Sequence, residues 1–525
     1  MSKKLNAQEE SVTLKHGIQW PIESGGKTTN VAKDIWCAAA DAGNENSLSK
    51  AIRNERNWRF GYSKHLAKLG DITAASSRDN AKHIASSGLN EMLKKFVFVQ
   101  LDNADPRNIT TTTLYDLGNI PYPGEGKSKF STKKLEGTKA IPSELSFAYQ
   151  KGTLEASQIG NKMKEWVEYG TCEPDCTDKV LKVVPALAEG SLKGKWFVLL
   201  GAGSEMGPLK FLLTYGANVI AIRTRKSKGW LNMAKIAEDS AGTLFVPIAK
   251  DEKILSDGDA VTTNWSEMAG CDILTETLDI RNWIIDVLGG PNPKTEVTVG
   301  LYTYLDSEAH VRVTLGCDVI MTGIEKAFSR TRFAYIGSTS VSTAITQEME
   351  DAVSKNRAAS PLWMKATRCL PPVTSKLENV MDSQSEDKTI HLRHGFILAQ
   401  GPNYALAKTA QVWRAMIATN YPSFCVGPIT RTESVCHNTT MAAMLKSYDR
   451  IKPYEIMDPP CASTILGLLL AYDILFEELD RDQKTGHPFE RTLGGSFHSG
   501  DLRGPYNVES SKCLSGVLFV LGKYC

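Results

Sequence analysis

The chain has 525 residues, of which 42% are hydrophobic and 23% charged, and its formal net charge is +2. This length and apolar content predict two or three folding units with a sizeable core, and the near-neutral charge gives no reason to expect nucleic acid or an anionic membrane as a partner. Eleven cysteines without regular spacing and a polar start, Met1 to Lys4, predict a reducing, cytoplasmic location. Oligomeric state is left open, with a homo-oligomer compatible with this composition.

The first part of the chain predicts a mainly helical N-terminal region over residues 1–190, packed on the rest of the chain. Helical periodicity runs over Ile52 to Leu69 and Asn80 to Lys95, and Phe96 to Val99 has the pattern of a short strand. Residues Pro121 to Lys134 are rich in Pro, Gly, Lys and Ser, which predicts a connector.

From Lys195 onward, short apolar runs alternate with helical stretches. The predicted strands are Trp196–Leu200, Asn218–Ile222, Leu244–Ile248, Val297–Tyr302, Phe333–Gly337 and Phe424–Val426. Helices are expected over Pro208–Tyr215, Glu308–Phe328 and Tyr404–Ala418. Such alternation predicts an α/β fold with a doubly wound parallel sheet, Rossmann-like, over residues 191–480. Within this domain, a break around Pro371 indicates an insertion over about 341–400, before the helix that begins at Tyr404.

The end of the chain adds two expectations. Residues Ala462 to Phe476 are the longest apolar stretch, but it is too short and too polar to span a bilayer, so it predicts a buried helix and no membrane span. Residues 481–525 are expected to form a Gly-rich C-terminal extension.

A glycine-rich turn, Gly201-Ala202-Gly203-Ser204-Glu205-Met206-Gly207, lies where the first predicted strand gives way to a helix. Glycine allows a tight turn and lets a diphosphate approach backbone N–H groups near a helix start, which indicates a nucleotide-binding turn. The alternative is a purely structural turn in the same fold.

The second predicted strand ends in a cluster of cations, Arg223-Thr224-Arg225-Lys226-Ser227-Lys228. An acidic residue at this place usually holds a free ribose 2′-hydroxyl. Cations instead suit a 2′-phosphate, which favours NADPH, with NADH less favoured. The alternative interpretation is a solvated basic loop.

Tyr404 and Lys408 lie one helical turn apart and therefore share a helix face. In a cleft, the cation is expected to lower the pKa of the phenol and make it a usable proton donor near neutral pH. Tyr448 and Lys452 have the same spacing, so the surroundings of each pair must decide between them. Along the helix of the first pair, Leu406, Ala410, Trp413 and Ile417 recur at helical spacing, which predicts packing against the sheet.

These motifs, taken in order, resemble the short-chain dehydrogenase/reductase superfamily over about residues 193–435. Leu200 to Gly207 resembles its T-G-x-x-x-G-x-G turn, Tyr404 to Lys408 its Y-x-x-x-K, and Gly427-Pro428-Ile429-Thr430 the turn that borders the nicotinamide. Tyr335 to Ser340 resembles the strand end that carries the active serine.

The resemblance implies an NADPH-dependent oxidoreductase that reduces a small-molecule carbonyl or oxidises an alcohol by hydride transfer. Tyr404 would be the general acid/base, Lys408 would hold the nicotinamide ribose and lower the tyrosine pKa, and Ser338 or Ser340 would orient the carbonyl. The implied cofactor-binding residues are Gly201, Gly203, Ser204, Met206, Gly207, Arg223, Arg225, Lys408, Gly427 and Ile429.

The sequence departs from the family pattern at four places. Glu205 stands where a glycine normally lies beside the diphosphate, Val426 replaces a proline, and Thr314 stands near the place of an expected asparagine. The fourth departure is the insertion, which is expected at the mouth of the site as a lid or pocket wall. A non-catalytic Rossmann-fold nucleotide-binding or regulatory protein is therefore the alternative.

Four further motifs are interpreted as structural. They are the P-loop-like Ser24 to Thr29, the pair Cys172 and Cys176, the pair His391 and His394, and the loop Gly494 to Asp501. No strand precedes the first, and the cysteines have no second pair nearby, so no metal site is expected. A site role for the histidines, or for the loop as a substrate-contacting flap, is the less favoured interpretation.

Overall fold

The computed structural model describes residues 15–101, 108–250, 265–360, 374–381, 387–397, 400–437, 442, 445, 446, 448, 452–481, 486–493 and 497–505.

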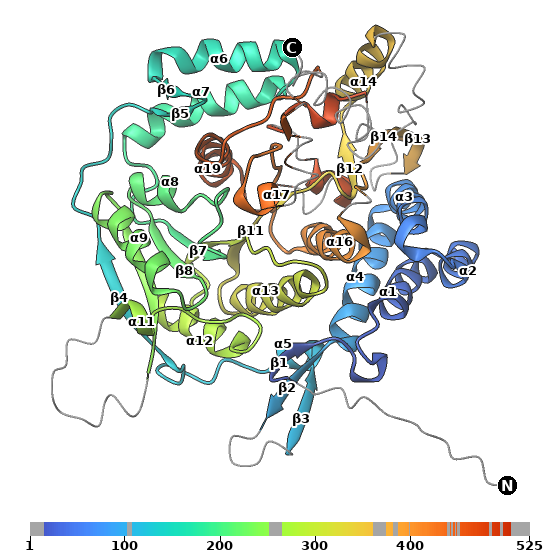
Figure 1. Ribbon diagram of the computed structural model, residues 1–525, viewed down its shortest axis with the longest axis horizontal. Helices are drawn as coiled ribbons and strands as arrows, with labels where there is room; N and C mark the ends of the chain where they lie inside the picture. The colour runs from blue at the N-terminus through green and yellow to red at the C-terminus, as the bar shows by residue number, and fades with distance from the viewer. Residues whose placement is uncertain are drawn as a thin grey trace.

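A seven-stranded mixed sheet forms the centre of the molecule, in the order β15-β11-β10-β7-β8-β9-β4 (Figure 1). Six of its strands run parallel: β7 (Trp196–Leu200), β8 (Asn218–Ile222), β9 (Thr243–Ala249), β10 (Glu296–Leu301), β11 (Arg330–Gly337) and β15 (Ser423–Val426). All six were predicted as strands. The chain builds outward from β7 first on one side and then on the other, so the order reverses between β7 and β10, as in doubly wound sheets.

Both faces of this sheet are covered, which explains why its strands are continuous apolar runs. Along β7, Phe197 and Leu199 pack into a core with α8 (Leu209–Thr214), α9 (Ser227–Glu238) and α19 (Pro459–Phe476). The alternate residues Val198 and Leu200 pack on the opposite face with α12 (Thr277–Val287) and α13 (Ala309–Ala327). A strand whose successive side chains both enter a core needs no polar alternation.

The seventh strand, β4 (Phe130–Glu136), pairs antiparallel with β9 at one edge of the sheet. It takes the second half of the predicted connector and lies inside the predicted region 1–190, so the boundary at 190 does not divide the chain into two separate units. Phe130 is buried against Trp283 of α12, and that one apolar contact anchors a strand whose outer residues are polar.

Four helices at the N-terminus form a second layer behind the sheet: α1 (Thr28–Ala42), α2 (Asn46–Asn54), α3 (Trp58–Ala75) and α4 (Arg78–Lys95). The single helix predicted over Ile52 to Leu69 is wrong, since α2 and α3 meet at a turn where the Glu55 carboxylate accepts the Asn57 N–H at 3.0 Å. Both helices bury apolar residues in one core, which is why the periodicity continues across the turn.

This second layer also corrects the packing predicted for α16 (Gly401–Ile417). Trp413 of α16 packs edge-on against Trp36 of α1, with ring centroids 5.3 Å apart, rather than against the sheet. A Cβ on Gly88 of α4 would lie 2.4 Å from the Trp413 ring, so glycine is what lets these helices approach so closely. The N-terminal helices therefore support the back of the helix that carries Tyr404.

The remaining elements surround this centre. The strands β1 (Gly17–Gln19), β2 (Val97–Leu101) and β3 (Ile109–Thr113) form a small sheet, and β5 (Phe147–Tyr149) and β6 (Gly152–Leu154) a hairpin. Between β11 and α16, the strands β12 (Ser342–Ile345), β13 (Thr374–Met381) and β14 (Asp387–His394) form an antiparallel sheet beside α14 (Gln347–Ala359). The other helices are η1 (Ile22–Ser24), α5 (Leu114–Asn119), α6 (Ala156–Tyr169), α7 (Pro174–Ala188), α11 (Trp265–Met268), α17 (Glu433–His437), η2 (Pro488–Thr492) and η3 (Asp501–Arg503).

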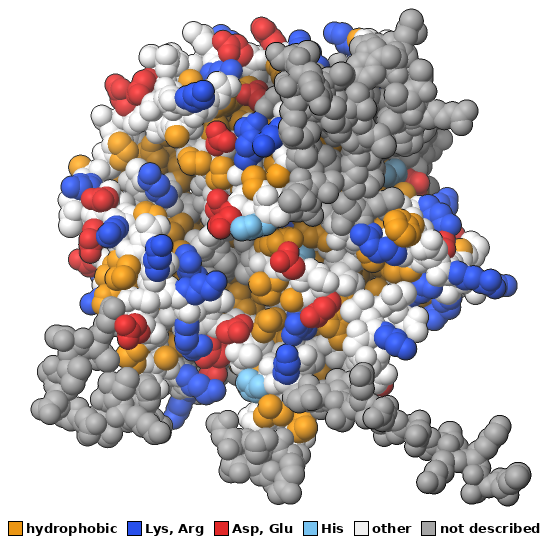
Figure 2. Space-filling model, viewed as in Figure 1, with side chains coloured by type: hydrophobic (Ala, Val, Ile, Leu, Met, Phe, Trp, Pro, Cys, Tyr) orange, Lys and Arg blue, Asp and Glu red, His pale blue; other side chains and the backbone are white. Residues whose placement is uncertain are grey.

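In the described part of the chain, one helix, α19, is long and apolar enough to cross a membrane by length and composition. Half of that segment is buried inside the protein, where it packs beside α7. Core helices pass the same test, so this is weak evidence for a membrane segment. On the face shown in Figure 2, basic and acidic side chains are interspersed.

Candidate functional site

The glycine turn lies directly after β7, at the point where the strand order reverses. Gly201 has φ +91°, and a Cβ there would lie 2.7 Å from the Thr303 nitrogen of the chain leaving β10. A side chain at this position would therefore be strained and would collide with backbone. In open α/β sheets, ligands bind at such a switch point, beyond the carboxyl ends of the strands.

Part of the turn is free to bind an anion. The N–H groups of Ser204 and Gly207 are used within the turn, at 3.0 Å each. Among the described residues, the N–H groups of Gly203, Glu205 and Met206 have no hydrogen-bond partner. The helix that follows, α8, has only six residues, so these turn amides rather than a long helix supply donors to a phosphate.

Arg223, at the end of β8, lies across the glycine turn. A Cβ on Gly203 would lie 2.9 Å from one terminal guanidinium nitrogen, and a Cβ on Gly229 would lie 2.2 Å from the other. The Arg223 side chain is half-buried and has no ion pair or hydrogen bond among the described residues. Arg225 differs, because its guanidinium donates to the Glu276 carboxylate at 2.6 Å.

Tyr404 lies at the start of α16 and interacts with Ser338 at the end of β11. Burial raises the pKa of Tyr404 above its ordinary value, and the hydrogen bond with Ser338 partly opposes that rise. The expected lowering of this pKa by Lys408 is therefore wrong in this structure. The Lys408 ammonium lies 5.9 Å from the centre of the Tyr404 ring, over its face rather than beside the hydroxyl.

Lys408 itself is held one turn further along α16. Its ammonium donates to the Ile336 carbonyl of β11 and to the Gln411 side-chain oxygen, both at 3.2 Å. Burial lowers the pKa of Lys408 to about 8. The lysine is thus fixed at the carboxyl end of β11, beside the tyrosine that it was predicted to accompany.

The structure distinguishes the two candidate serines. Ser338 interacts with Tyr404 and its hydroxyl oxygen also accepts the Ser340 N–H at 3.2 Å. Ser340 is buried and hydrogen-bonds to the side-chain oxygen of Gln400. Ser338 is therefore the serine placed to contact a ligand together with Tyr404.

Two aromatic residues of this site were missed by the sequence analysis. His310, in the first turn of α13, stacks on Tyr404 with ring centroids 5.3 Å apart and an interplanar angle of 15°. Tyr304 follows β10 and lies 5.2 Å from His310 and 6.4 Å from Tyr404. The signal was their place at the carboxyl end of a predicted strand and the start of the following helix, where parallel sheets collect functional residues.

The imidazole of His310 is neutral at physiological pH. It is 1% exposed, and burial, with the nearby Lys408 cation, lowers the pKa of His310 to about 3. Its Nδ1 accepts the Leu305 N–H at 3.4 Å. His310 thus connects the loop after β10 to the ring of Tyr404. Thr314, one turn further along α13, is buried, and its hydroxyl has no partner among the described residues.

The turn after β15 completes the same edge of the sheet. The Gly427 N–H donates to the Gly337 carbonyl at 3.1 Å, and a Cβ on Gly427 would lie 3.2 Å from the end of the Met206 side chain. Ile429 accepts the Met457 N–H at 2.9 Å. Val426, in the place of the family's proline, is buried as the last residue of β15.

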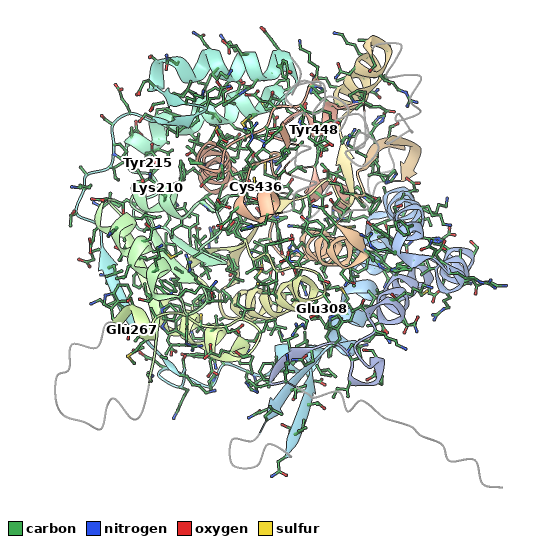
Figure 3. The ribbon with its side chains drawn as sticks, viewed as in Figure 1. Lys210, Tyr215, Glu267, Glu308, Cys436 and Tyr448 are labelled. Carbon is green, nitrogen blue, oxygen red and sulfur yellow. The ribbon has the colours of Figure 1, made fainter. Side chains whose placement is uncertain are left out.

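Glu205 is turned toward this same turn. Its carboxylate accepts the Glu433 N–H at 2.8 Å, at the start of α17. The charge is thus partly satisfied by a backbone donor, and the glycine turn is joined to the chain after β15. Figure 3 places α17, with Cys436 labelled, between the sheet and the C-terminal part of the molecule.

The rival pair, Tyr448 and Lys452, does not form a comparable site. Tyr448 is 1% exposed and packs on Tyr454, with ring centroids 5.4 Å apart (Figure 3). The Lys452 ammonium lies over the Tyr169 ring instead, 4.9 Å from its centre.

The other motifs have structural partners. Ser24 to Thr29 spans the end of η1 and the start of α1, with no strand of the central sheet before it. His394 bonds to Ser342 at 2.9 Å and to Asp71 at 3.1 Å, and His391 pairs with Glu350. Cys172 and Cys176 are buried thiols, and the described residues contain no cluster of three or more metal-ligating side chains.

The loop Gly494 to Asp501 is described only in part, since residues 494–496 lie outside the described residues. His498 bonds to Glu173 at 2.9 Å, and Asp501 accepts from the Thr339 hydroxyl. The C-terminal piece is therefore tied to Thr339, which lies between the two candidate serines.

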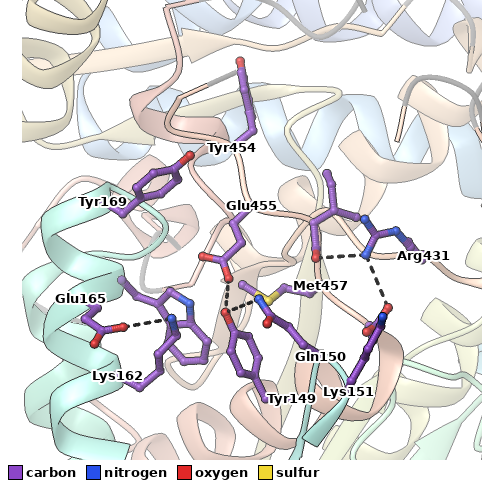
Figure 4. A pocket seen from close by; sticks show the side chains of 13 residues that line it. Tyr149, Gln150, Lys151, Lys162, Glu165, Tyr169, Arg431, Tyr454, Glu455 and Met457 are labelled. Atoms are coloured by element: carbon purple, nitrogen blue, oxygen red, sulfur yellow. Dashed lines mark hydrogen bonds and ion pairs between the residues drawn. The ribbon is translucent and has the colours of Figure 1, made fainter. Parts of the chain in front are cut away.

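A separate cavity of about 760 Å³ lies beside the turn after β15, between α6, the β5–β6 hairpin and residues 454–458 (Figure 4). It shares Arg431 and Met457 with the backbone pairing that holds this turn, because the Arg431 N–H donates to the Met457 carbonyl at 2.9 Å. None of the predicted site residues lines it.

No protein-family model, curated protein or solved structure matches the chain. The structure defines an α/β protein with a mainly parallel seven-stranded sheet, compatible with a Rossmann-like fold. Its function must be inferred from the geometry of the site.

Proposed function

We propose that the protein is an NADPH-dependent oxidoreductase of the short-chain dehydrogenase/reductase type, which reduces a carbonyl or oxidises an alcohol by hydride transfer. One observation carries the proposal: the glycine turn, Ser338 with Tyr404, Lys408 and the turn at Gly427 all meet at the carboxyl edge of the sheet. These segments are separated by up to two hundred residues in sequence, and only the fold brings them together.

The residues at this edge fit a dinucleotide. The unpaired N–H groups of Gly203, Glu205 and Met206 supply donors for the diphosphate. Arg223, whose guanidinium has no partner among the described residues, supplies the charge that a 2′-phosphate requires. Arg225 contributes less, because Glu276 already neutralises it. A bound nicotinamide would supply the hydride of the reduction.

Tyr404 would donate its proton to the substrate carbonyl oxygen as that oxygen gains negative charge. Its raised pKa keeps the phenol protonated at neutral pH, which favours carbonyl reduction over alcohol oxidation. Ser338, bonded to the same hydroxyl, would orient the carbonyl. Lys408 remains mostly protonated below its pKa of about 8, so its positive charge would stabilise the phenolate left behind.

The second candidate function is a non-catalytic nucleotide-binding or regulatory protein. It is favoured by the contacts that join the glycine turn to the chain after β15, namely Glu205 to the Glu433 N–H and Met206 against Gly427. A diphosphate between the two turns would have to displace these side chains. Both candidates require the nucleotide to bind, but only the first requires Tyr404.

Titration calorimetry with NADPH and NADH, followed by a carbonyl reduction assay, separates the candidates. Tyr404→Phe is expected to lower kcat at least about 100-fold, the usual contribution of a positioned acid, while the Kd for NADPH stays within about threefold because the phenol contacts no phosphate. Tyr115→Phe, at an exposed tyrosine of α5, is the matched control. Turnover retained in Tyr404→Phe would refute the mechanism, and tight binding without turnover on a broad carbonyl panel would favour the second candidate.

A further inference from the structure

The cavity beside α6 has the size and chemistry of a small-molecule site that is separate from the Tyr404 site. Its volume of about 760 Å³ lies within the range of ligand pockets. Three segments form its walls: the hairpin turn with Tyr149 and Lys151, the face of α6 with Lys162 and Glu165, and residues 454–458 with Arg431. Segments so far apart in sequence hold it open as a feature of the tertiary structure.

The two ends of the cavity differ in charge. At one end, Lys162 and Glu165 form an ion pair at 3.1 Å and neutralise each other. At the other end, Figure 4 shows Lys151 and Arg431 together. Arg431 lies 3.6 Å from the carboxylate of Asp458, while Lys151 has no ion pair among the described residues, so this end has an excess of positive charge.

The middle of the cavity contains a carboxylate without a counter-cation. Glu455 accepts hydrogen bonds from the Tyr149 hydroxyl at 2.5 Å and the Thr171 hydroxyl at 3.0 Å, both of which are neutral donors. No described cation lies within ion-pair distance of it. A carboxylate has about four acceptor positions, so two remain for a ligand, and a charged N–H donor bonds most strongly there.

The aromatic rings around this carboxylate already face cations. The Lys162 ammonium lies 4.9 Å from the centre of the Tyr149 ring and 5.5 Å from that of Trp166. Ring faces attract ammonium groups. The centre of the cavity therefore favours an ammonium group, whereas the Arg431 end favours an anion.

We propose that this cavity binds an α-amino acid or a similar zwitterion, with its carboxylate at Arg431 and Lys151, its ammonium at Glu455 and its side chain against the aromatic wall. A ligand with only an ammonium group would leave the basic end uncompensated, and one with only a carboxylate would face Glu455. A ligand with both charges satisfies both ends, and this recognition does not depend on the proposed reductase activity.

The test is calorimetry on the full chain with L-phenylalanine, L-leucine and L-lysine, and with two one-charge analogues, 2-phenylethylamine and 3-phenylpropanoate. At least one amino acid is expected to bind, and L-phenylalanine at least tenfold more tightly than either analogue. Glu455→Gln should remove the preference for L-phenylalanine over 3-phenylpropanoate. Arg431→Met, at a half-exposed position that is easily replaced, should remove its preference over 2-phenylethylamine.

Glu168→Gln, at an exposed carboxylate of α6 outside the cavity, is the matched control and should bind as the unchanged protein does. Tyr404→Phe should also leave amino-acid binding unchanged, which separates this site from the proposed reductase site. The proposal is overturned if no amino acid binds, if the one-charge analogues bind equally well, or if a folded Glu455→Gln and a folded Arg431→Met both keep the preferences of the unchanged protein. If Glu455→Gln does not fold, Arg431→Met and Lys151→Met decide the question by the same comparison.

Discussion

Lys408 offers a prediction that needs no knowledge of the substrate. Burial lowers its pKa from 10.5 to about 8 in the folded protein. Between these two pH values the unfolded chain binds more protons at this lysine than the folded chain, so this residue makes the free energy of unfolding increase as the pH rises from 8 to 10.5. At about 1.4 kcal/mol per pKa unit, the full effect is on the order of 3 kcal/mol.

The assay compares urea unfolding of the unchanged protein with that of Lys408→Met, which keeps the length of the side chain and removes its titration. Loss of the bonds to the Ile336 carbonyl and Gln411 shifts the variant's stability by an amount that does not depend on pH. The difference in unfolding free energy between the two proteins should therefore change by about 3 kcal/mol over the interval, in favour of the unchanged protein at high pH. Lys164→Met, at an exposed lysine of α6, should show no such change. Parallel stability curves for Lys408→Met and the unchanged protein would refute the buried, desolvated position of this ammonium.

Three further variants test the site. His310→Ala should lower kcat about tenfold or more by releasing the stacked ring, and His310→Phe, which keeps a flat ring, should restore most of it; equal loss in both would show that the stack is not what matters. Arg223→Gln should weaken NADPH binding about 10- to 100-fold without affecting NADH, whereas Arg225→Gln, already paired in the folded state, should have a smaller effect by titration calorimetry. Gly201→Ala should destabilise by at least about 1–2 kcal/mol because of its positive φ and backbone clash, while Gly118→Ala, with open space around it, should leave the urea midpoint nearly unchanged.

The strands of the central sheet were predictable from local sequence. The run Trp196–Leu200 is apolar throughout because Phe197 and Val198 enter different cores on the two faces of the sheet. The same local reasoning did not identify β4, since its pattern is polar and only its pairing with β9 makes it a strand. Nor did it detect the break between α2 and α3, because both helices bury residues in one core.

The candidate site was predictable in part, for a similar reason. The glycine turn and the tyrosine–lysine spacing are local patterns, and they identified the residues that the fold brings to one edge. Partners that come from elsewhere in the chain were not readable: Gln400 for Ser340, Glu276 for Arg225, and His310 for the Tyr404 ring. The direction of the Tyr404 pKa shift depended on these surroundings as well.

The amino-acid sequence by itself determined the alternation of buried strands and helices, because apolar periodicity and glycine placement act over a few residues. The tertiary structure alone decided which side chains are buried, which charges are neutralised and which rings meet. Burial and Coulombic interactions depend on distance in space rather than along the chain. For that reason Lys408 was recognisable as a candidate from its spacing, while its lowered pKa and its place over the Tyr404 ring emerged only when α16 packed against the end of β11.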